Sequence, residues 1–475
     1  KAIVCTHASN VTGDGNDIAQ IGALCEKYNL YFILDTSQTA GAAGIDMEQD
    51  HISAICFTGH KGLFGPQGTG GIALADGVCV KPLLSGGSGV HSFERKHPVE
   101  LPTALEAGTL NGHGIAGLHA ALDWIKKTGI AAIHEKEMAL AEQFQRGIET
   151  IPGIHLYGGE KRVAAIVSCN LADLDSAYVS DCLAEDYGIA TRAGVHCAPL
   201  IHTHFGTEKQ GMVRFSFSCF NTTEEVEKAV GAMRDIAAEN RGKVTAYVGA
   251  GGKTSAIRKR AETMRTEGKK VLILTTTKMM RPQEQEIFAA YEQTWQQRAI
   301  PDTASGWREC RTAEKKWKEQ VQSILDTYGC CVAGSLIPGT EKFGMLPEKL
   351  MEDLLYLADE ILIEADGSAH MPVKAPAEHE PVLFPYMDEV VIVMGAHAIG
   401  KPLQEVCHRA DYAKKILKCD ADKIVTATDI RVLAEQGYAI PIQKQFPWMK
   451  ISKVTGKDIK LCLTAEKKDK ERDKQ

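Results

Sequence analysis

The sequence lacks the features that would place it in a membrane or on nucleic acid. No apolar run reaches the ~18 residues that a membrane-spanning helix needs, and no charged-then-apolar leader opens the chain at Lys1. The formal net charge is -7 over 475 residues, so the basic excess typical of nucleic-acid binders is absent. We therefore expect a cytoplasmic protein that binds no membrane and no nucleic acid.

The cysteines also lack a diagnostic pattern. The 14 cysteines are scattered and form no Cys-x-x-Cys pair. A small secreted scaffold would show dense, regular spacing. We expect most of them to be buried thiols. The remaining composition, 44% hydrophobic and 24% charged, is that of an ordinary globular protein, and the length predicts two or three domains. Chemistry on a small molecule becomes the leading class of function.

Short apolar runs alternate with longer amphipathic stretches, which predicts an α/β fold. In the first half the predicted elements are a helix at 17–28, strands at 31–34, 54–57 and 70–74, helices at 114–126 and 131–150, a strand at 164–170, and helices at 176–186 and 223–240. The later strand and helices indicate a smaller α+β subdomain. After residue 242 the pattern restarts with a strand at 243–248 and a glycine turn. We predict domains at 1–241 and 242–464, and a charged tail at 465–475.

A carboxylate and a lysine follow two of the predicted strands. Asp35 comes directly after a buried strand, at the carboxyl end where α/β folds bind ligands. Lys61 lies in a loop of small, hydroxyl and glycine residues at 58–71, after the next strand. Pyridoxal phosphate requires a lysine amine for a Schiff base and a carboxylate that keeps its pyridine nitrogen protonated. Alone, Asp35 is more readily a helix cap and Lys61 a solvated lysine, but together they predict a pyridoxal-phosphate site.

Four short segments carry a more specific signal. They are His-Ala-Ser-Asn at 7–10, Asp-Thr-Ser-Gln at 35–38, Thr-Gly-His-Lys at 58–61 and Arg-Ala-Gly-Val-His-Cys-Ala-Pro at 192–199. Together they resemble class-V aminotransferase-fold enzymes, specifically cysteine desulfurases and selenocysteine lyases, over about residues 1–240. The resemblance implies the pyridoxal-phosphate transferase fold type I, with part of its large domain and a small α+β subdomain.

The resemblance implies a role for each matching residue. The cofactor-binding set is Asn10 and Gln38 at the phenolic oxygen, Asp35 at the ring nitrogen, Thr58 and His60 at the phosphate, and Lys61 as the Schiff-base lysine. It further implies a homodimer in which Thr109 touches the neighbour's phosphate, and substrate binding by Arg192 and Arg214. The family has a segment ahead of the position of Lys1, with a phosphate-binding turn and a stacking aromatic ring. We therefore expect the site in this sequence to be incomplete.

Cys197 is the candidate nucleophile. It lies in a glycine- and proline-flanked loop with His196 and Arg192 beside it, an electropositive setting that favours a thiolate. Most cysteines are inert core residues, and this setting sets Cys197 apart from them. In the family such a thiolate attacks the sulfur of a cysteine–cofactor adduct, which leaves alanine and a cysteine persulfide. Simple aminotransferases of the same fold need no such cysteine, so Cys197 favours a desulfurase, with Lys61 and Cys197 as catalytic residues.

The second half opens with a possible phosphate loop. The run Gly-Ala-Gly-Gly-Lys-Thr-Ser at 249–255 follows a predicted strand and precedes a predicted helix at 256–265, where backbone amides would cradle a phosphate. It departs from the P-loop pattern, because Tyr247 occupies the place of the first glycine. A plain tight turn is the alternative. The P-loop-like reading predicts nucleotide contacts at Gly249, Gly251, Gly252, Lys253, Thr254 and Asp366.

A later strand, predicted at 361–363, ends in Glu-Ala-Asp-Gly. This pattern predicts that Glu364 or Asp366 binds Mg²⁺, as carboxylates at strand ends do in phosphate-handling sites. An Asp-Gly turn without a ligand is the alternative. Together with the glycine run, Thr-Thr-Thr-Lys-Met at 275–279 and the segment 374–381, it resembles YqeC, a selenium-dependent hydroxylase accessory protein, over about 243–418. That resemblance implies binding of an ATP-type nucleotide with Mg²⁺.

The two halves together suggest one pathway. We hypothesise that a lyase mobilises sulfur or selenium from cysteine or selenocysteine on Cys197, and that a nucleotide-dependent unit helps to deliver it to a molybdenum hydroxylase or its cofactor. One alternative is a class-V aminotransferase in which Cys197 is incidental. The other is a non-catalytic adaptor, whose first half dimerises and docks the second.

Overall fold

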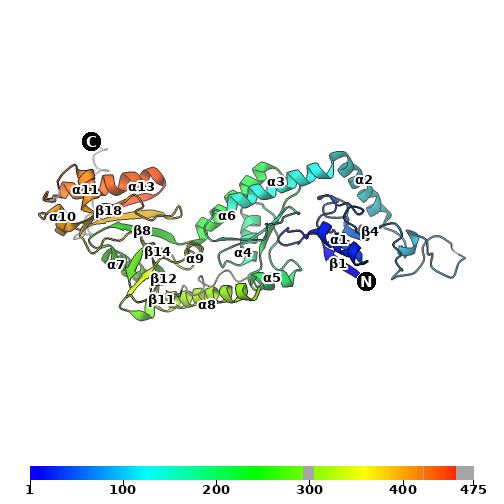
Figure 1. Cartoon of the computed structure of the whole chain (residues 1–475), viewed down its shortest axis with the longest axis horizontal. Coiled ribbons are helices and arrows are strands. Elements are labelled where there is room, and N and C mark those ends of the chain that lie inside the picture. Colours follow the sequence, from blue (N-terminus) through cyan, green and yellow to red (C-terminus); the bar gives the residue numbers. More distant parts are fainter. Residues whose placement is uncertain (92, 293–303, 421, 456–475) are drawn as a thin grey trace. The chain divides into compact units, whose positions relative to one another are not determined.

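The computed structural model describes the backbone of residues 1–91, 93–292, 304–420 and 422–455. The predicted tail at 465–475 and the end of the second predicted domain, 456–464, lie outside these residues. The chain forms two compact units, Lys1–Ile236 and a second that begins at Ala237 (Figure 1). Within the described ranges no helix combines the length and the apolar character needed to cross a bilayer.

A four-stranded mixed sheet forms the start of the first unit. Its strands, in spatial order, are β1 (Ala2–Thr6), β2 (Tyr31–Asp35), β3 (Ala54–Thr58) and β4 (Gly70–Leu74). The first three are parallel and β4 is antiparallel to β3. Because carboxyl ends of parallel strands meet at one edge of a sheet, the residues after β1, β2 and β3 are brought together there.

Helix α1 (Ile18–Lys27) connects β1 to β2 and covers the sheet's small core. Asp17 caps it, since its carboxylate accepts the amide of Gln20 at 3.0 Å. The helix lies very close to the backbone that leads into β3: a Cβ added to Gly22 would be 1.9 Å from the carbonyl oxygen of Asp50. Glycine is therefore required here by a close approach.

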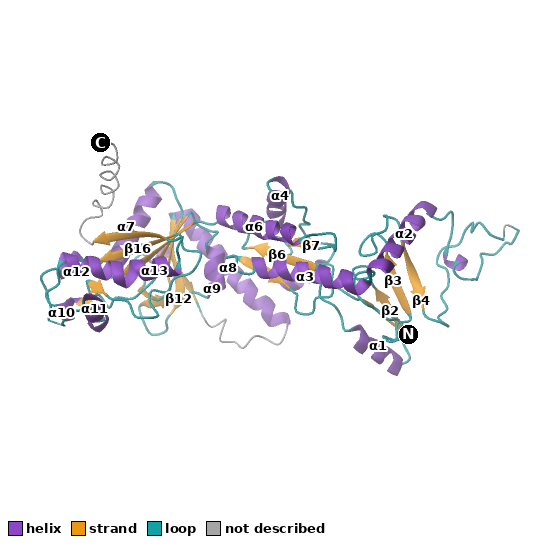
Figure 2. Cartoon of the chain, turned by 90° about the horizontal axis from the view of Figure 1, so that it is seen from above, coloured by secondary structure: helices purple, strands orange, loops and turns teal. Residues whose placement is uncertain are grey.

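An antiparallel three-stranded sheet and its helices complete the first unit (Figure 2). The central strand of this sheet is buried along its whole length. Phe144 of the helix α3 (Ile130–Ile148) packs on this sheet, with its ring centroid 4.3 Å from that of Phe215 on the strand next to the central one. The elements are α2 (Gly112–Thr128), α3 (Ile130–Ile148), β5 (Ile154–Tyr157), β6 (Ile166–Leu171), α4 (Ser176–Glu185), α5 (Pro199–Phe205), β7 (Val213–Ser216) and α6 (Thr223–Asn240), with a short 3₁₀ turn η1 (Thr103–Leu105) before them.

The second unit is built on one nine-stranded, largely parallel sheet. Its spatial order is β10-β13-β12-β9-β14-β8-β16-β18, with β11 paired to β12. The strands are β8 (Lys243–Gly249), β9 (Val271–Thr275), β10 (Lys278–Met280), β11 (Phe288–Tyr291), β12 (Cys330–Leu336), β13 (Lys342–Gly344), β14 (Glu360–Glu364), β16 (Glu389–Met394) and β18 (Lys450–Thr455). A separate parallel pair consists of β15 (Val373–Lys374) and β17 (Cys407–His408).

Both faces of this sheet are covered. Along β9, Leu272 and Leu274 belong to one hydrophobic core, whereas Val271 and Ile273 belong to another, as the alternation of a strand requires. The helical segments are α7 (Lys253–Thr266), η2 (Gln285–Ile287), α8 (Ala304–Tyr328), α9 (Glu348–Leu354), η4 (Ala396–Ala398), α10 (Leu403–Val406), α11 (Ala410–Leu417), α12 (Ala427–Val432), the π-helix η5 (Leu433–Ala439) and α13 (Ile440–Gln445). Helix α7 lies on one face, and α8, α9 and η5 contribute to the other core.

The predicted helices and strands of the first half are confirmed, with ends shifted by at most two residues. In the second half the predicted strand, glycine turn and helix are also present, as β8, residues 249–252 and α7. The mixed α/β class is therefore correct.

A matched pair of substitutions tests the close packing of α1. We expect Gly22→Ala to lower the stability of the protein, because the new methyl group overlaps the Asp50 carbonyl. Gly231→Ala in α6 is the control, since a Cβ there meets nothing within 4 Å. Alanine favours a helix over glycine by up to about 1 kcal/mol, so this control should be neutral or stabilising. Urea unfolding measures both, and equal midpoints would contradict the account.

Candidate functional site

Lys61 lies at the carboxyl edge of the first sheet, in the turn after β3. Partial burial lowers the pKa of its amine, Asp35 raises it, and Arg214 and Arg192 lower it further. The net direction is downward. A lysine can act as a nucleophile toward an aldehyde only as the neutral amine, so this environment suits Schiff-base chemistry.

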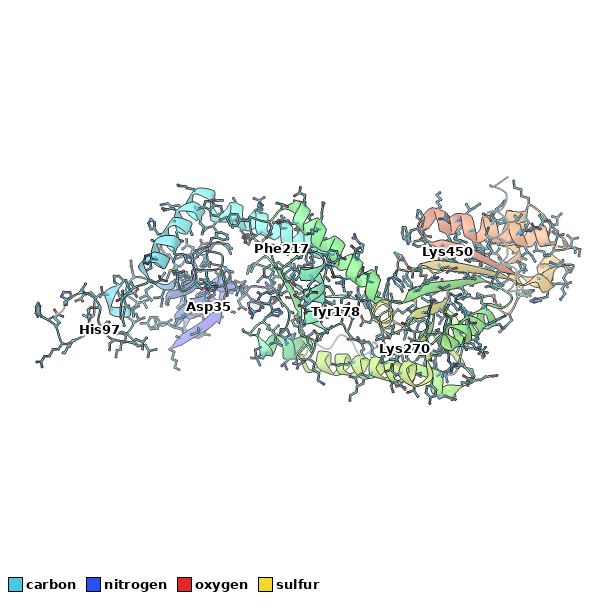
Figure 3. The ribbon with its side chains drawn as sticks, turned by 180° about the vertical axis from the view of Figure 1, so that it is seen from behind. Asp35, His97, Tyr178, Phe217, Lys270 and Lys450 are labelled. Atoms are coloured by element: carbon cyan, nitrogen blue, oxygen red, sulfur yellow. The ribbon has the colours of Figure 1, made fainter. Side chains whose placement is uncertain are left out.

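Asp35 ends the neighbouring strand β2, as the sequence predicts (Figure 3). One of its carboxylate oxygens accepts the Ser37 amide at 2.9 Å and the Ser37 hydroxyl at 2.6 Å. These two bonds fix the carboxylate at the strand end. Its side chain remains exposed, so the other oxygen is accessible to a ligand.

The other predicted cofactor contacts lie around the same edge or in an exposed loop. The Thr58 hydroxyl is 2.7 Å from Nδ1 of His60, so these two side chains already form a pair. Gln38 is half-buried in the turn after β2, three residues beyond Asp35. Thr109 is exposed in the loop before α2, and it is distant in the sequence from the other predicted cofactor contacts.

Asn10 links the sheet edge to the loop that carries the cysteine. Its side-chain amide donates to the carbonyl oxygen of His196 at 2.7 Å. Its own carbonyl oxygen accepts Nη1 of Arg214 at 2.9 Å. Three segments distant in sequence therefore meet here: the residues after β1, the loop at 192–197, and β7.

Two backbone hydrogen bonds pair Arg192 with Arg214, so the two residues lie side by side. The amide of Arg192 donates to the carbonyl of Arg214 at 3.2 Å, and the reverse bond is 2.9 Å. Nη2 of Arg192 lies 3.8 Å from Sγ of Cys197, an exposed thiol. Nε of Arg214 is buried and has no hydrogen-bond partner among the residues that the structure describes. The pair presents positive charge with unused donor capacity next to the thiol.

The predicted contribution of His196 to this positive charge is wrong. His196 is 2% exposed, and burial lowers the pKa of its imidazole. The hydrogen bond to the backbone of Arg192 raises this pKa, whereas the nearby charges of Arg214, His202 and Arg192 lower it further. Its ring nitrogens face the carbonyl of Arg192 and the ring of His202 rather than the thiol. Arginine, not histidine, supplies the charge beside Cys197.

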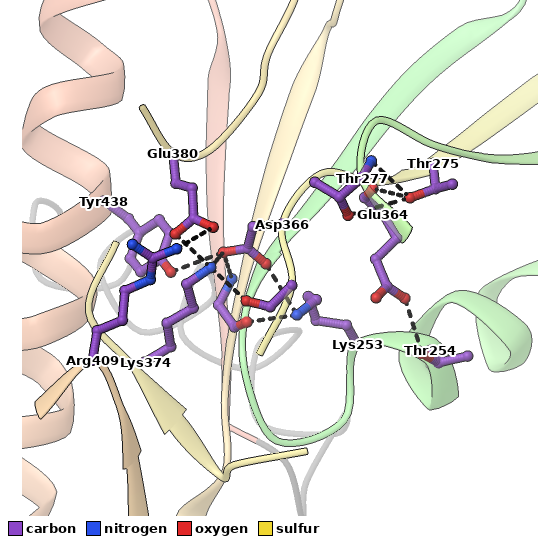
Figure 4. A network of polar contacts seen from close by, with 12 residues as sticks. Lys253, Thr254, Thr275, Thr277, Glu364, Asp366, Lys374, Glu380, Arg409 and Tyr438 are labelled. Atoms are coloured by element: carbon purple, nitrogen blue, oxygen red, sulfur yellow. Dashed lines mark hydrogen bonds and ion pairs between the residues drawn. The ribbon is translucent and has the colours of Figure 1, made fainter. Parts of the chain in front are cut away.

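In the second unit, Asp366 is the centre of a buried polar network (Figure 4). Oδ2 accepts the backbone amide of Gly249 at 3.0 Å and the hydroxyl of Tyr438 at 2.9 Å. Oδ1 lies 3.0 Å from Nζ of Lys253, and Oδ2 lies 3.3 Å from Nζ of Lys374. Two hydrogen-bond donors and two lysine ammonium groups, all from separate segments, thus converge on one carboxylate.

Sequence reasoning assigned no role to several members of this network. Lys374 is completely buried and contacts Glu380 at 2.8 Å, and Glu380 in turn pairs with Arg409 at 3.2 Å. Burial raises the pKa of Glu380, but the hydrogen bond and charge of Lys374, the Ala377 amide and the charge of Arg409 together outweigh it, so the net direction is downward. Lys374 and Glu380 lie in the segment 374–381 quoted above, whereas Tyr438 and Arg409 carry no local signal.

Glu364 lies apart from that network, beside the predicted phosphate loop. Its Oε2 accepts the Thr254 hydroxyl at 2.9 Å. Burial raises its pKa, although Lys253 and Thr254 oppose the shift. The carboxylate of Glu364 and the hydroxyl of Thr254 are oxygen ligands of the types that Mg²⁺ takes in phosphate-handling sites. Across the described ranges, however, no three His, Cys, Asp or Glu side chains cluster as metal ligands would.

The glycine turn at 249–252 is shaped by packing and remains open at one position. Gly251 has a φ of 78°, and a Cβ there would lie 2.4 Å from the carbonyl of Pro372. Gly252 precedes α7, and a Cβ there would meet nothing within 4 Å. Lys253 reaches back over the turn, with Nζ 2.6 Å from the carbonyl oxygen of Gly249. The turn is therefore closely packed at Gly251 and leaves space at Gly252.

Comparison with known families finds two matches, which lie in separate stretches of the chain. Residues 1–229 match the family described as Aminotransferase class-V. Residues 245–411 match the YqeC protein family. The chain thus contains one segment that matches the class-V aminotransferase family and one that matches the YqeC family, and both predicted resemblances are confirmed.

Individual relatives match the first half. A protein named "Probable cysteine desulfurase" from Methanothermobacter thermautotrophicus is 32% identical over 242 residues, 50% of this chain and 60% of the relative. The "Cysteine desulfurase" of Shigella flexneri is 30% identical over 241 residues, 50% of this chain and 58% of the relative. The apo structure of a cysteine desulfurase from Thermococcus onnurineus NA1 matches with 30% identity and a TM-score of 0.47, covering 50% of this chain and 60% of that one. The chain thus spans about 60% of the length of these relatives.

The environment of Lys61 predicts how its amine titrates in variants. We expect Arg192→Gln to raise the pKa of Lys61, because it removes a cation that lowers it, and Asp35→Asn to lower that pKa further. A shift of one pKa unit changes the neutral fraction about tenfold at a fixed pH below the pKa. Competitive acetylation across pH, resolved by peptide mass spectrometry, measures this shift. Other lysines of the chain are internal controls. Equal shifts at all lysines, or shifts of the opposite sign at Lys61, would contradict the electrostatic assignment.

Proposed function

We propose, for a chain that joins a class-V aminotransferase domain to a YqeC domain, that the first unit mobilises sulfur or selenium from cysteine or selenocysteine. The observation that carries the proposal is the thiol of Cys197 beside Arg192, within the same constellation as Lys61, Asp35 and Arg214. An exposed thiol next to a guanidinium is suited to act as a thiolate nucleophile. The matches to proteins named cysteine desulfurase support this choice of reaction.

Pyridoxal phosphate is the cofactor that the residues fit. The lowered pKa of Lys61 favours the neutral amine that the cofactor requires, and the strand-end carboxylate of Asp35 suits the ring nitrogen. When bound, the cofactor supplies an electron sink. The residues that would hold it are Lys61, Asp35, Asn10, Gln38, Thr58 and His60, with Thr109 of a second copy in a homodimer.

The substrate's carboxylate and sulfur are matched by the arginine pair and the thiol. Arg214 has a buried Nε without a partner among the described residues, so a carboxylate would satisfy it as a charge-assisted hydrogen-bond acceptor. Arg192 would hold the Cys197 sulfur as an anion. In the reaction the carbon–sulfur bond of the substrate breaks and a sulfur–sulfur bond forms on Cys197. The substrate carbon takes a proton and leaves in alanine, so no external oxidant is needed.

For the second unit we propose binding of an ATP-type nucleotide with Mg²⁺. Gly252, Lys253 and Thr254 form the candidate phosphate contact at the start of α7, with Gly249 and Gly251 shaping the turn. Asp366 already accepts from two neutral donors and pairs with two lysines. Glu364, bonded to the Thr254 hydroxyl, is therefore the better candidate for the Mg²⁺ ligand. Asp366 would instead position the ammonium group of Lys253 beside the phosphate site.

The two activities would serve one purpose, delivery of the mobilised sulfur or selenium to a molybdenum hydroxylase or its cofactor. The support for this step is the fusion of the two domains in one chain and the resemblance of the second to selenium-dependent hydroxylase accessory proteins.

Alanine release tests the first activity. With pyridoxal phosphate and cysteine or selenocysteine, we expect the intact protein that contains this chain to release alanine. Bound cofactor should give it an absorbance near the violet edge of the visible range. Lys61→Ala should abolish both signals, because the covalent anchor is lost. Cys197→Ser should keep the absorbance and reduce alanine release to background, because the acceptor thiol is lost.

Two other outcomes would assign a different function. Transfer that depends on a keto acid and survives Cys197→Ser would show a class-V aminotransferase. Absence of any cofactor absorbance in the chain would favour the adaptor. Either result would contradict the proposed desulfurase.

Nucleotide binding tests the second activity. We expect Lys253→Met to weaken binding of Mg²⁺-ATP by at least about tenfold, because it removes the cation at the candidate phosphate site. Glu364→Gln should abolish the gain in affinity that Mg²⁺ gives and leave metal-free binding intact. Lys270→Met is the matched control, since Lys270 pairs with Asp326 at the opposite end of β9. Calorimetric titration measures all three, and wild-type affinity in Lys253→Met would contradict the proposal.

A further inference from the structure

Two buried histidines lie in line behind the Cys197 loop. His202 is completely buried and His196 nearly so, and their rings lie edge to edge with nearly parallel planes, 24° apart, and centroids 5.6 Å apart. Nδ1 of His196 is 3.4 Å from Nε2 of His202, and Nδ1 of His202 is 2.9 Å from the Thr207 hydroxyl. At the other end, Nε2 of His196 is 2.9 Å from the carbonyl oxygen of Arg192.

The direction of every hydrogen bond in this line follows from its acceptor end. A carbonyl oxygen only accepts, so Nε2 of His196 carries a hydrogen and Nδ1 of the neutral ring is an acceptor. Nε2 of His202 must then donate to it, which leaves Nδ1 of His202 to accept the Thr207 hydroxyl. Burial is the largest influence on both imidazoles and lowers the pKa of each, in agreement with two neutral rings.

This chain of hydrogen bonds, from the Arg192 carbonyl through His196 and His202 to Thr207, holds the backbone of the loop that carries Cys197. His196 and Cys197 have φ angles of 51° and 57°, in the left-handed region that L-residues rarely adopt. The carbonyl of His196 is held by Asn10 at 2.7 Å, and its ring spans from Arg192 to His202. Arg192, whose guanidinium lies 3.8 Å from the Cys197 sulfur, is thus fixed at its own carbonyl by the same ring.

We propose that His202 and Thr207 are positioning residues for Cys197, which act through His196 to hold the thiol against Arg192. Thr207 starts the line and is itself fixed: its amide donates to the His202 carbonyl at 2.9 Å, and its carbonyl accepts the Gly211 amide at 2.8 Å. Neither residue touches the thiol. The purpose of this arrangement rests on the proposed function, but the arrangement itself does not require a cofactor.

The charge selectivity of Cys197 alkylation measures this positioning. With the guanidinium of Arg192 close to the sulfur, anionic iodoacetate should be favoured relative to neutral iodoacetamide. Losing one charge contact of a few ångströms in water changes a rate ratio by about fivefold. We expect Thr207→Val and His202→Met to lower the iodoacetate-to-iodoacetamide ratio at Cys197 by about that factor. Peptide mass spectrometry of the chain without added cofactor gives the ratio, and the ratio at Cys79 is the internal control.

Conservative variants separate positioning from general stability. Thr207→Ser keeps the hydroxyl, and His202→Gln keeps an amide that donates to His196, so both should retain the wild-type ratio. His204→Gln, on the exposed side of the same helix, should also leave it unchanged. A merely structural role would lower the melting temperature in these variants without this pattern at Cys197.

A wild-type ratio in folded Thr207→Val or in folded His202→Met would overturn the proposal. If neither folds, loss of the ratio in Thr207→Ser or His202→Gln would overturn it instead, and its retention would support it. Failure of alanine release in the wild-type chain would leave this measurement unaffected, so the proposed function and the positioning role fail separately.

Discussion

Two backbone hydrogen bonds between Arg192 and Arg214 determine where the groups of the first site lie. They hold two cations side by side, an arrangement that costs electrostatic energy unless anions are near. Burial lowers the pKa of Arg214, Arg192 lowers it further, and Cys197 raises it. Two adjacent guanidinium groups would attract an anion such as a carboxylate. Lys61 lies within the same field, which adds to the effect of burial in lowering the pKa of its amine.

Much of the first site could be predicted because its residues follow regular elements. Asp35 and Lys61 come after neighbouring parallel strands, so the fold brings them to one edge. Cys197 was identifiable from its glycine- and proline-flanked loop. His202 and Thr207 were not, because their spacing from Cys197 has no local periodicity and their importance depends on ring orientations. The same limitation explains the error at His196, since burial and hydrogen-bond direction decide its charge and neither is visible in the sequence.

In the second unit the sequence located the glycine turn but not its electrostatic partners. Asp366 was predicted from the end of a strand, yet its four partners come from β8, α7, β15 and the π-helix η5. A buried carboxylate requires such compensation, because an unpaired charge in the interior is costly. The network also explains a completely buried Lys374, which a sequence would assign to the surface. Tyr438 extends this constraint to the C-terminal helices of the unit.

The central claim is that Cys197 receives sulfur from the substrate. Mass spectrometry of the chain, after incubation with pyridoxal phosphate and cysteine and digestion without reductant, tests it most directly. The account predicts that the peptide containing Cys197 gains the mass of one sulfur atom, and that Lys61→Ala prevents the gain. Alanine release with no added sulfur on Cys197, or with the sulfur on another cysteine, would contradict it.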